Sequence, residues 1–294
     1  MIFASGLDAP EGPVPLPDGT WLAVETGLER GCVTHIGPDG QRLRVLARTG
    51  RPNGLAVDRD GVIWVAESLS PPSLIRLTSD GAYEVFLTGC DGEPFLYPND
   101  LAFGPDGALY LTDSGARFEE LMRIRQTQPE REKDLPLDGR VYRIDTRTGA
   151  AKKLDSGLRF ANGIAFGPDG RLYVSETRTG NIYRYRWEGG EVGPRELFAN
   201  VVDPAAVPAA GLGPGPDGMK FAADGNLYVA VHRQSDVTVL APNGSVVRRI
   251  RTRGSRPTNV AFAPPGQRRL HVTEMELGNI EAFDVGVDGF PLYG

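Results

Sequence analysis

The sequence has few of the residues that build covalent or metal–thiolate frameworks. Its 294 residues include two cysteines, Cys32 and Cys90, and three histidines, His35, His232 and His271. Two cysteines exclude a disulfide-rich scaffold, and neither residue type shows the paired spacing of a structural zinc site. We therefore expect two reduced thiols, as is usual in a cytoplasmic protein.

Long apolar runs and an excess of positive charge are also absent. No apolar run approaches the length of about 18 residues that a membrane-spanning helix needs, so no membrane segment is expected. The first eight residues lack the basic start and apolar core of a signal peptide, which again favours the cytoplasm. A formal net charge of −6 argues against nucleic acid as the main partner. A small molecule is the expected partner, and the sequence leaves the oligomeric state open.

Glycine and proline are abundant instead, with 38 and 24 residues, as expected for many short strands joined by turns. The strands belong to a repeat whose clearest copy is residues 98–113. It reads as a polar residue, a short apolar strand, an Asp-Gly turn and a second apolar strand that ends in an acid. In the first copy the pattern predicts strands over about 12–16, 21–25, 32–36 and 43–46.

Six polar positions, which we call the gate residues, define the repeat. They are Glu11, Asn53, Asn99, Asn162, Asp217 and Thr258. The turn glycine follows the gate residue by eight positions in every copy, and the gates recur at intervals of 42, 46, 63, 55 and 41 residues. This is the period of a four-stranded propeller blade. The last copy has three strands, and residues 2–5 offer a spare one. We therefore predict an all-β fold in which residues 1–294 form a single six-bladed β-propeller, closed by the N-terminal strand.

Connection lengths predict which face of the ring carries function. The turns on the face away from the gates are expected to be short, and the long connections are 88–98, 114–139 and 199–216. All three fall on the gate face, where loops on a rigid scaffold commonly carry function. Residues 117–134 are dense in charge and are interpreted either as a short helix that acts as a lid or as a solvated surface excursion.

The gate residues are predicted to meet at the mouth of the central channel, because innermost strands surround one axis. Two carboxylates and several amides crowded there would repel one another and lose water unless a cation were present. Oxygen ligands and irregular geometry suit a divalent metal, Ca²⁺ best, with Mg²⁺, Mn²⁺ and Zn²⁺ as alternatives. A simpler interpretation is that each Asn or Asp forms a turn at strand entry. That interpretation does not explain the shared register.

The same residues carry a resemblance to a known family. The segments concerned are 10–13, 98–100, 162–165, 216–219 and 284–294. Over nearly its whole length the chain resembles the senescence-marker-protein/gluconolactonase/luciferin-regenerating family. The resemblance implies that Glu11, Asn162 and Asp217 bind a divalent ion, often Ca²⁺, and that Asn99 binds it or lies beside it.

The chain departs from the regucalcin-like lactonases of that family at two positions. They have an arginine two residues before the third-blade Asn, where this chain has Tyr97, and a Glu roughly where it has Arg117. Both departures argue against a plain aldonolactone as the substrate. We expect Tyr97, Arg117, Asn53 and Asn99 to contact the substrate. Arginine beside aromatic residues favours an anionic molecule.

The sequence therefore predicts a metal-dependent hydrolase that opens a lactone. Asp217 is the predicted general base as well as a metal ligand. Asn99 is also predicted to be catalytic, in contact with both ion and substrate. His232 is a candidate proton donor or relay, or else a hydrogen-bonded scaffold residue. Two alternatives remain. One is a phosphotriesterase-like hydrolase, and the other is a non-catalytic binding propeller in which the ion only ties the inner strands together.

Overall fold

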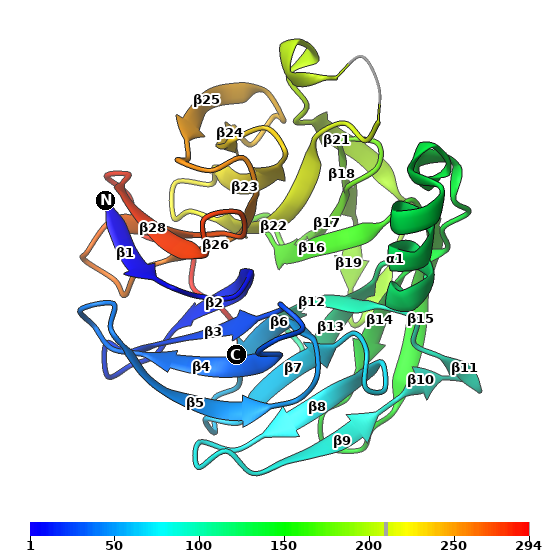
Figure 1. Ribbon diagram of the computed structural model, residues 1–294, viewed down its shortest axis with the longest axis horizontal. Helices are drawn as coiled ribbons and strands as arrows, with labels where there is room; N and C mark the ends of the chain where they lie inside the picture. Colours follow the sequence, from blue (N-terminus) through cyan, green and yellow to red (C-terminus); the bar gives the residue numbers. More distant parts are fainter. Residues whose placement is uncertain (209–210, 294) are drawn as a thin grey trace.

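Six antiparallel sheets of four strands lie around a central axis in the computed structural model, which describes residues 1–208 and 211–293 (Figure 1). The innermost strands are β2 (Pro10–Pro15), β6 (Pro52–Val57), β12 (Pro98–Phe103), β16 (Ala161–Phe166), β22 (Gly215–Phe221) and β26 (Pro257–Phe262). Each contacts the next in this order, and β26 contacts β2, so the ring is continuous at its centre. The fold is the six-bladed β-propeller that the sequence predicts.

Three further strands complete each blade, counted outwards. They are β3 (Trp21–Glu25), β4 (Cys32–Ile36) and β5 (Arg42–Arg48) in blade one; β7 (Ile63–Glu67), β8 (Ser73–Leu77) and β9 (Tyr83–Leu87) in blade two; β13 (Leu109–Asp113), β14 (Gly139–Ile144) and β15 (Ala151–Leu158) in blade three; β17 (Leu172–Glu176), β18 (Asn181–Tyr185) and β21 (Glu196–Asn200) in blade four; β23 (Leu227–His232), β24 (Asp236–Leu240) and β25 (Val246–Arg251) in blade five; and β27 (Arg269–Glu274), β28 (Asn279–Asp284) and β1 (Ile2–Ser5) in blade six. The second and third strands of blade one match their predicted bounds. The first strand begins two residues earlier than predicted, so the gate residue lies within it.

The sixth blade combines both ends of the chain. β1 pairs antiparallel with β28, with Ala4 opposite Ile280 and Ser5 opposite Asn279. The N-terminus therefore lies beside β28 at the rim of the ring (Figure 1). The pairing expected for residues 2–5 is present.

The core lies between neighbouring blades. One cluster joins Leu22 and Val24 of β3 to Ile63 and Val65 of β7. Successive residues of a strand point to opposite faces, and in a propeller blade both faces pack on other blades. The second strands are accordingly buried along almost their whole length. This packing holds the innermost strands, and with them the gate residues, in fixed positions.

Connections on the face away from the gates are not all short, which corrects the sequence prediction. An extra hairpin, β19 (Trp187–Glu188) with β20 (Glu191–Val192), lies between the third and fourth strands of blade four. Trp187 Nε1 donates to the Tyr110 hydroxyl at 2.7 Å, and its ring packs on Phe166. Residues 289–293 also line an apolar cavity of about 460 Å³ at this end of the channel. The hairpin and the tail therefore cover part of the far face.

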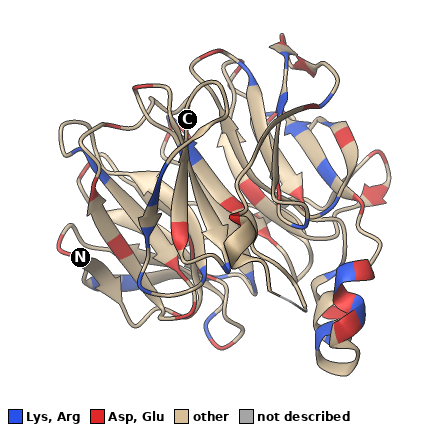
Figure 2. Ribbon diagram, turned by 90° about the horizontal axis from the view of Figure 1, so that it is seen from above, with Lys and Arg blue, Asp and Glu red and all other residues tan. Residues whose placement is uncertain are grey.

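The gate face carries the long connections that the sequence predicts. One contains the hairpin of β10 (Gly89–Cys90) and β11 (Glu93–Pro94), and another contains the short helix η2 (Pro204–Ala206). The third forms α1 (Phe118–Thr127) and η1 (Pro129–Asp134). Figure 2 shows α1 standing at one side of the ring, with charged residues along it.

The helix of this third connection is attached by its apolar side. Leu121 is buried and packs with Tyr97, Ala116 and Leu135. Acids in the first turn and Arg125 in the last turn complement the helix dipole. The predicted helix is therefore present, with one side packed on the ring and the other exposed.

Cys32 and Cys90 are buried and free, so they form no disulfide. Across residues 1–208 and 211–293, no helix has both the length and the apolar character needed to cross a bilayer.

Candidate metal centre

Every innermost strand has an irregularity immediately at its gate residue. The pairing with the second strand shifts register between residues 11 and 14, 52 and 55, 98 and 101, 161 and 164, 216 and 219, and 257 and 259. A bulge of this kind interrupts the strict alternation of side chains between the two faces of a strand. A gate residue and its successor can therefore both take part in one site.

The residue after the gate decides how closely neighbouring blades approach. In four blades it is glycine: Gly12, Gly54, Gly163 and Gly218. A Cβ atom on Gly54 would lie 2.4 Å from the carbonyl oxygen of Asn99 in the next blade, which is too close for any side chain. Blades three and six, opposite each other in the ring, have Asp100 and Asn259 at this position.

Three carboxylates lie near the axis. Glu11 and Asp100 are buried, and the side chain of Asp217 is 13% exposed. Burial, reinforced by the charge of Asp100, raises the pKa of Glu11 to about 8. Burial, with the charges of Glu11 and Asp100, raises the pKa of Asp217 well above its usual value. The cluster therefore attracts either protons or a cation.

The amide groups of two gate residues are oriented by hydroxyl groups. Asn99 Nδ2 donates to Ser114 Oγ at 2.9 Å, and Ser114 donates its own proton to the Ala161 carbonyl at 3.0 Å. Asn162 donates to Thr177 at 3.1 Å in the same way, and Thr177 donates to a carbonyl of the next blade at 2.8 Å. Because each hydroxyl proton is already used, the hydroxyl oxygen can only accept from the amide. Each Oδ1 atom is therefore turned away from its hydroxyl.

One of these oxygens lacks a partner. Asn162 Oδ1 is buried and accepts no hydrogen bond from any residue that the structure describes. A buried acceptor without a donor is costly, so this oxygen is suited to contact a cation or a water molecule. The Asn162 side chain also acts to lower the pKa of Asp217, against the larger effect of burial, so the two predicted ligands are neighbours.

These observations fit a divalent cation held by oxygen atoms. The predicted set of Glu11, Asn99, Asn162 and Asp217 supplies two carboxylates and two oriented amides, and hard oxygen ligands of this kind suit Ca²⁺. No three His, Cys, Asp or Glu side chains in residues 1–208 and 211–293 form a group that could hold a metal. The amides are therefore needed to complete the set, and a typical zinc site does not fit.

The other two gate residues, Thr258 and Asn53, are not in the predicted ligand set and make other contacts. Thr258 Oγ1 donates to the Pro10 carbonyl at 2.8 Å, so it links the last blade to the first. Asn53 Nδ2 lies 3.5 Å from the Tyr97 hydroxyl, which is a weak contact. Tyr97 is buried against α1 and accepts a hydrogen bond of 2.6 Å from Arg51, whose guanidinium lies 4.1 Å from the Phe118 ring centroid. Asn53 and Tyr97 are thus neighbours, and their contact with a substrate stays a prediction.

His232 is beside the carboxylate cluster. Its Nδ1 atom is 3.9 Å from Asp217 Oδ2 and has no hydrogen-bond partner in the described part of the chain. Burial, reinforced by the charges of Arg233 and Arg256, lowers the pKa of His232 to about 3. The imidazole is therefore neutral at pH 7, so it suits a relay better than a protonated acid.

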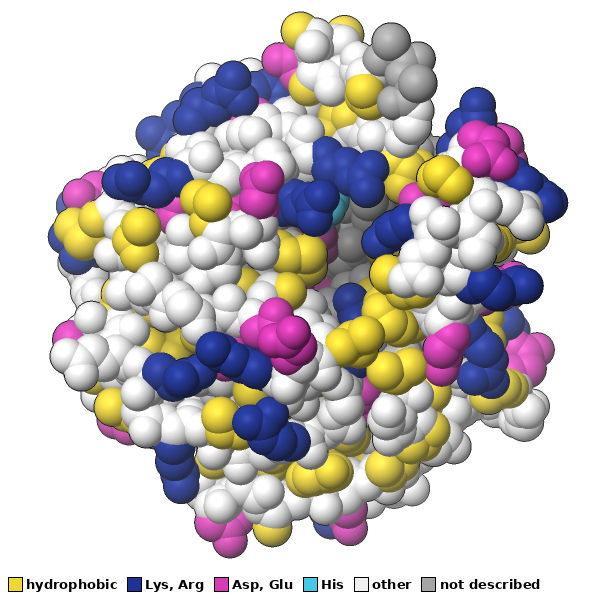
Figure 3. Space-filling model, in the orientation of Figure 1, with side chains coloured by type: hydrophobic (Ala, Val, Ile, Leu, Met, Phe, Trp, Pro, Cys, Tyr) yellow, Lys and Arg dark blue, Asp and Glu magenta, His cyan; other side chains and the backbone are white. Residues whose placement is uncertain are grey.

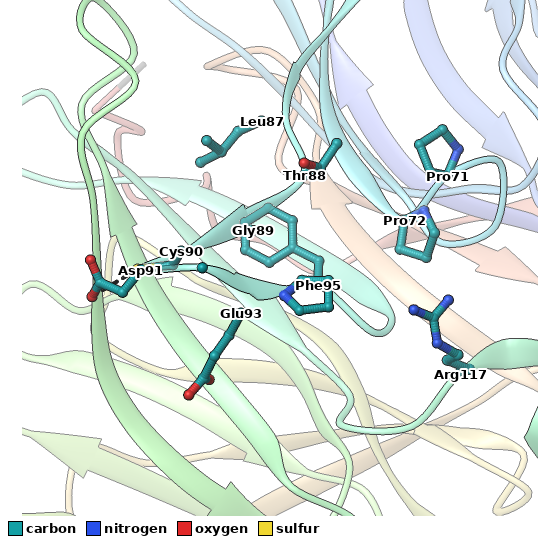
Figure 4. Close-up of a pocket in the computed structure, with 12 residues that line it drawn as sticks. Pro71, Pro72, Leu87, Thr88, Gly89, Cys90, Asp91, Glu93, Phe95 and Arg117 are labelled. Atoms are coloured by element: carbon teal, nitrogen blue, oxygen red, sulfur yellow. Dashed lines mark hydrogen bonds between the residues drawn. The ribbon is translucent and has the colours of Figure 1, made fainter.

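Arg117 is predicted to contact the substrate, and this stays a prediction. It lines a separate pocket of about 410 Å³ with Pro72, Cys90 and Phe95, next to the β10–β11 hairpin (Figure 4). It is the residue before α1, so the direction in which the helix leaves the blade determines where its side chain lies. A repeat pattern contains no information about that direction.

Several residues near the site were missed by sequence reasoning. For Asp100 and Asn259 a signal was available, because they replace the glycine that follows four of the gates. Asn259 Nδ2 donates to Glu11 Oε2 at 3.0 Å, and the charge of Asp100 acts on both Glu11 and Asp217. Arg51 gave no comparable signal, since its role depends on Tyr97 and Phe118 from distant segments.

The chain is a six-bladed propeller that gathers acidic and amide side chains at one mouth of its channel. It is therefore a propeller with a polar site on its axis. Within that class, the chain belongs to the SMP-30/gluconolactonase/LRE-like family, whose family model matches residues 69–276. This confirms the resemblance that the sequence motifs indicate.

Individual relatives match most of the chain. It is 28% identical over 298 residues to diisopropyl-fluorophosphatase of Loligo vulgaris, covering 93% of this chain and 88% of that protein. It is 28% identical over 283 residues to a gluconolactonase of Zymomonas mobilis, covering 90% and 76%. The solved structure of regucalcin from Agrobacterium tumefaciens, described as a calcium-binding protein, superposes with a TM-score of 0.76 at 21% identity, covering 100% of this chain and 96% of that one. That structural likeness shows a shared fold.

Proposed function

We propose that this protein is a divalent-metal-dependent hydrolase that opens a lactone at the gate mouth. The observation that carries the proposal is the meeting of two carboxylates of raised pKa, Glu11 and Asp217, with the oriented amide of Asn162. A relative named gluconolactonase supports the choice of a lactone as the substrate.

Glu11, Asn99, Asn162 and Asp217 would hold the ion. Ca²⁺ suits their oxygen atoms best, and the structural neighbour described as calcium-binding agrees with this choice. Mg²⁺, Mn²⁺ and Zn²⁺ are alternatives to be tested by metal exchange. A bound ion of this kind would supply Lewis-acid polarisation of a carbonyl oxygen.

The protein's own residues would move the proton. Asp217 takes a proton from the attacking water, which adds to the carbonyl carbon of the lactone. The ring C–O bond then breaks, and the alkoxide that leaves takes the proton back from Asp217. His232 is neutral, and its Nδ1 atom lies 3.9 Å from Asp217 Oδ2, where it could relay this proton. Asn53 and Tyr97 form the wall against which the substrate is held.

A second hydrolase function is favoured by a specific observation. A relative named diisopropyl-fluorophosphatase covers 93% of the chain, so a phosphorus ester is an alternative substrate for the same residues. The remaining alternative is a binding propeller without catalysis. It would use the ligand set but need no proton acceptor.

The test is hydrolysis of a panel of lactones and one fluorophosphate, followed with a pH indicator before and after treatment with chelator. Lactone opening that disappears with chelator and returns with one added metal supports the proposal. Fluorophosphate cleavage alone would favour the second function. No turnover of either, together with retained metal binding, would overturn the hydrolase proposal in favour of a binding propeller.

A further inference from the structure

Four arginines from four different connections gather at the gate face. They are Arg125 in α1, Arg178 between β17 and β18, Arg233 between β23 and β24, and Arg256 before β26; we call them the rim arginine cluster. Figure 3 shows Lys and Arg side chains around the hollow in this region of the molecule. The four connections are far apart in the sequence, and the closed ring brings their charges together.

Ion pairs only partly balance the cluster. Arg125 and Arg178 share one carboxylate, with Nη2 of each lying 2.5 Å and 3.4 Å from Glu132 Oε1. Arg233 donates to the neutral carbonyl of Leu212 at 3.2 Å. An exposed acid, Glu276, lies near the exposed Arg256 and balances part of its charge. The four positive charges still exceed the two negative charges of Glu132 and Glu276.

Two arginines of the cluster are partly shielded from water. The side chain of Arg178 is 8% exposed and lies over the Phe160 ring, and Arg233 is half-buried. Burial lowers the pKa of both arginines, and the charge of Arg125 lowers each further. Buried like charges are costly unless an anion compensates them.

The backbone at Arg233 adds a second, independent observation. Arg233 and Ser235 have φ angles of 66° and 61°, in the left-handed region that non-glycine residues rarely adopt. Such strain costs on the order of 1–3 kcal/mol per residue and tends to occur at functional sites. Arg233 lies in the turn directly after His232, close enough to Arg125 and Arg256 for their charges to act on it.

The cluster is one side chain away from the proposed reacting centre. Arg233, Arg256 and Arg125 all act electrostatically on His232, whose Nδ1 atom is 3.9 Å from Asp217. A small molecule with its carbonyl group at Asp217 would therefore have its far end among these arginines.

We propose that the substrate carries an oxyanion, a carboxylate or a phosphate, at the end remote from the reacting carbonyl, and that the rim arginine cluster binds it. The planar guanidinium group matches both anions in geometry and charge. The inference rests on the proposed hydrolase function for the position of the carbonyl. It also moves the anion contact away from Arg117, which lines a different pocket.

The kinetic test uses three D-gluconolactones that differ at carbon 6, with a hydroxyl, a carboxylate (glucarolactone) or a phosphate (6-phosphogluconolactone). We expect kcat/KM for at least one anionic lactone to exceed that for the neutral one by about tenfold or more. The better of the two anionic lactones shows whether the site takes a carboxylate or a phosphate. In Arg233→Gln and Arg256→Gln this preference should fall by about tenfold, the effect of losing one charge-assisted contact of about 1.4 kcal/mol. Arg147→Gln, at an 88% exposed site in the turn between β14 and β15, is the control and should keep the preference.

A binding measurement separates this inference from the proposed function. Calorimetry at fixed free Ca²⁺ compares glucarate with gluconate, which has one carboxylate fewer, in the wild type and in both arginine variants. If no lactone is opened but glucarate binds more tightly than gluconate and Arg233→Gln removes the difference, the anion site stands and the hydrolase proposal fails. If all three lactones are opened alike and the arginine variants change nothing, the inference is overturned while the hydrolase stands. If neither measurement shows a preference for the anionic compound, the inference is also overturned.

Discussion

Asn259 donates from Nδ2 to Glu11 Oε2 at 3.0 Å, across the junction between the last blade and the first. The bond leaves Glu11 with a fixed orientation although its carboxylate is buried and its pKa is raised. Asn259→Ala should therefore weaken Ca²⁺ binding by about 10–100-fold, the usual effect of losing a group that orients a ligand. Calorimetric titration of Ca²⁺ measures this directly. Asn243→Ala, in an exposed turn, is a matched control that should bind as the wild type does.

Glu11→Gln is predicted to change stability in opposite directions with and without metal. Without metal the variant should be at least as stable as the wild type, because it removes a carboxyl group whose pKa is raised on folding, at a cost to stability, by burial and by the charge of Asp100. At saturating Ca²⁺ it should be less stable, because it binds the ion more weakly and gains less from it. Thermal unfolding with chelator and with Ca²⁺ checks both signs. Equal stabilisation of the two proteins by Ca²⁺ would contradict the assignment of Glu11 as a ligand.

Asp217 and Asn162 are predicted to differ in catalysis but not in holding the ion. Asp217→Asn keeps an oxygen atom and nearly the same volume but removes the proton acceptor, so turnover at full metal occupancy should fall by about 10²–10⁴-fold. Asn162→Asp keeps an oxygen ligand and adds charge, so it should lose much less. Metal content is measured first, and turnover is then compared at saturation. Full activity of metal-loaded Asp217→Asn would move the base to another residue, with His232 the next to test.

The close approach of the blades can be tested at glycine. Gly54→Ala would place a Cβ atom 2.4 Å from the Asn99 carbonyl, so the second and third blades would have to separate. We expect a loss of stability of more than about 2 kcal/mol and weaker Ca²⁺ binding. Gly61→Ala, with φ of 78° and open space around it, should lose only about 1 kcal/mol and bind Ca²⁺ normally. Chemical denaturation and metal titration of both variants make the comparison.

His271 should make stability depend on pH. Its ring is buried between Phe3 and Trp21, and burial, with the charge of Arg269, lowers its pKa to about 4. The unfolded chain binds a proton below about pH 6.5 and the folded chain only below about 4, so the contribution of this group to stability is present above 6.5 and is lost as the pH falls to 4. The loss is at most about 3 kcal/mol.

His271→Phe keeps an aromatic ring without a titrating group, so it isolates this effect. The difference in unfolding free energy between variant and wild type should shift in favour of the variant as the pH falls from 7 to 4. A difference that stays constant over that range would show that His271 does not titrate in this way.

The sequence predicts the ring and the register of the site because both depend on short-range spacing. A turn glycine eight residues after each gate fixes where each inner hairpin lies, and Glu11, Asn162 and Asp217 then meet by symmetry. Arg117 and the rim arginine cluster could not be predicted, since their positions depend on how α1 and the inter-strand links pack on the ring. Asp100 and Asn259 could have been predicted, because each replaces a glycine of the repeat by a polar residue at the axis.

The hydroxyl groups beside Asn99 and Asn162 make the chemical character of the centre depend on how tightly the ring is assembled. Ser114 presents its lone pairs to Asn99 only while its proton is bound to the Ala161 carbonyl of the next blade. If those two blades moved apart by the length of one hydrogen bond, the hydroxyl could turn and the amide could rotate to show its NH₂ group to the axis. A cation would then meet a donor where it requires an acceptor. A change at the blade seams, far from any ligand, would thus disable the centre without altering a single residue in it.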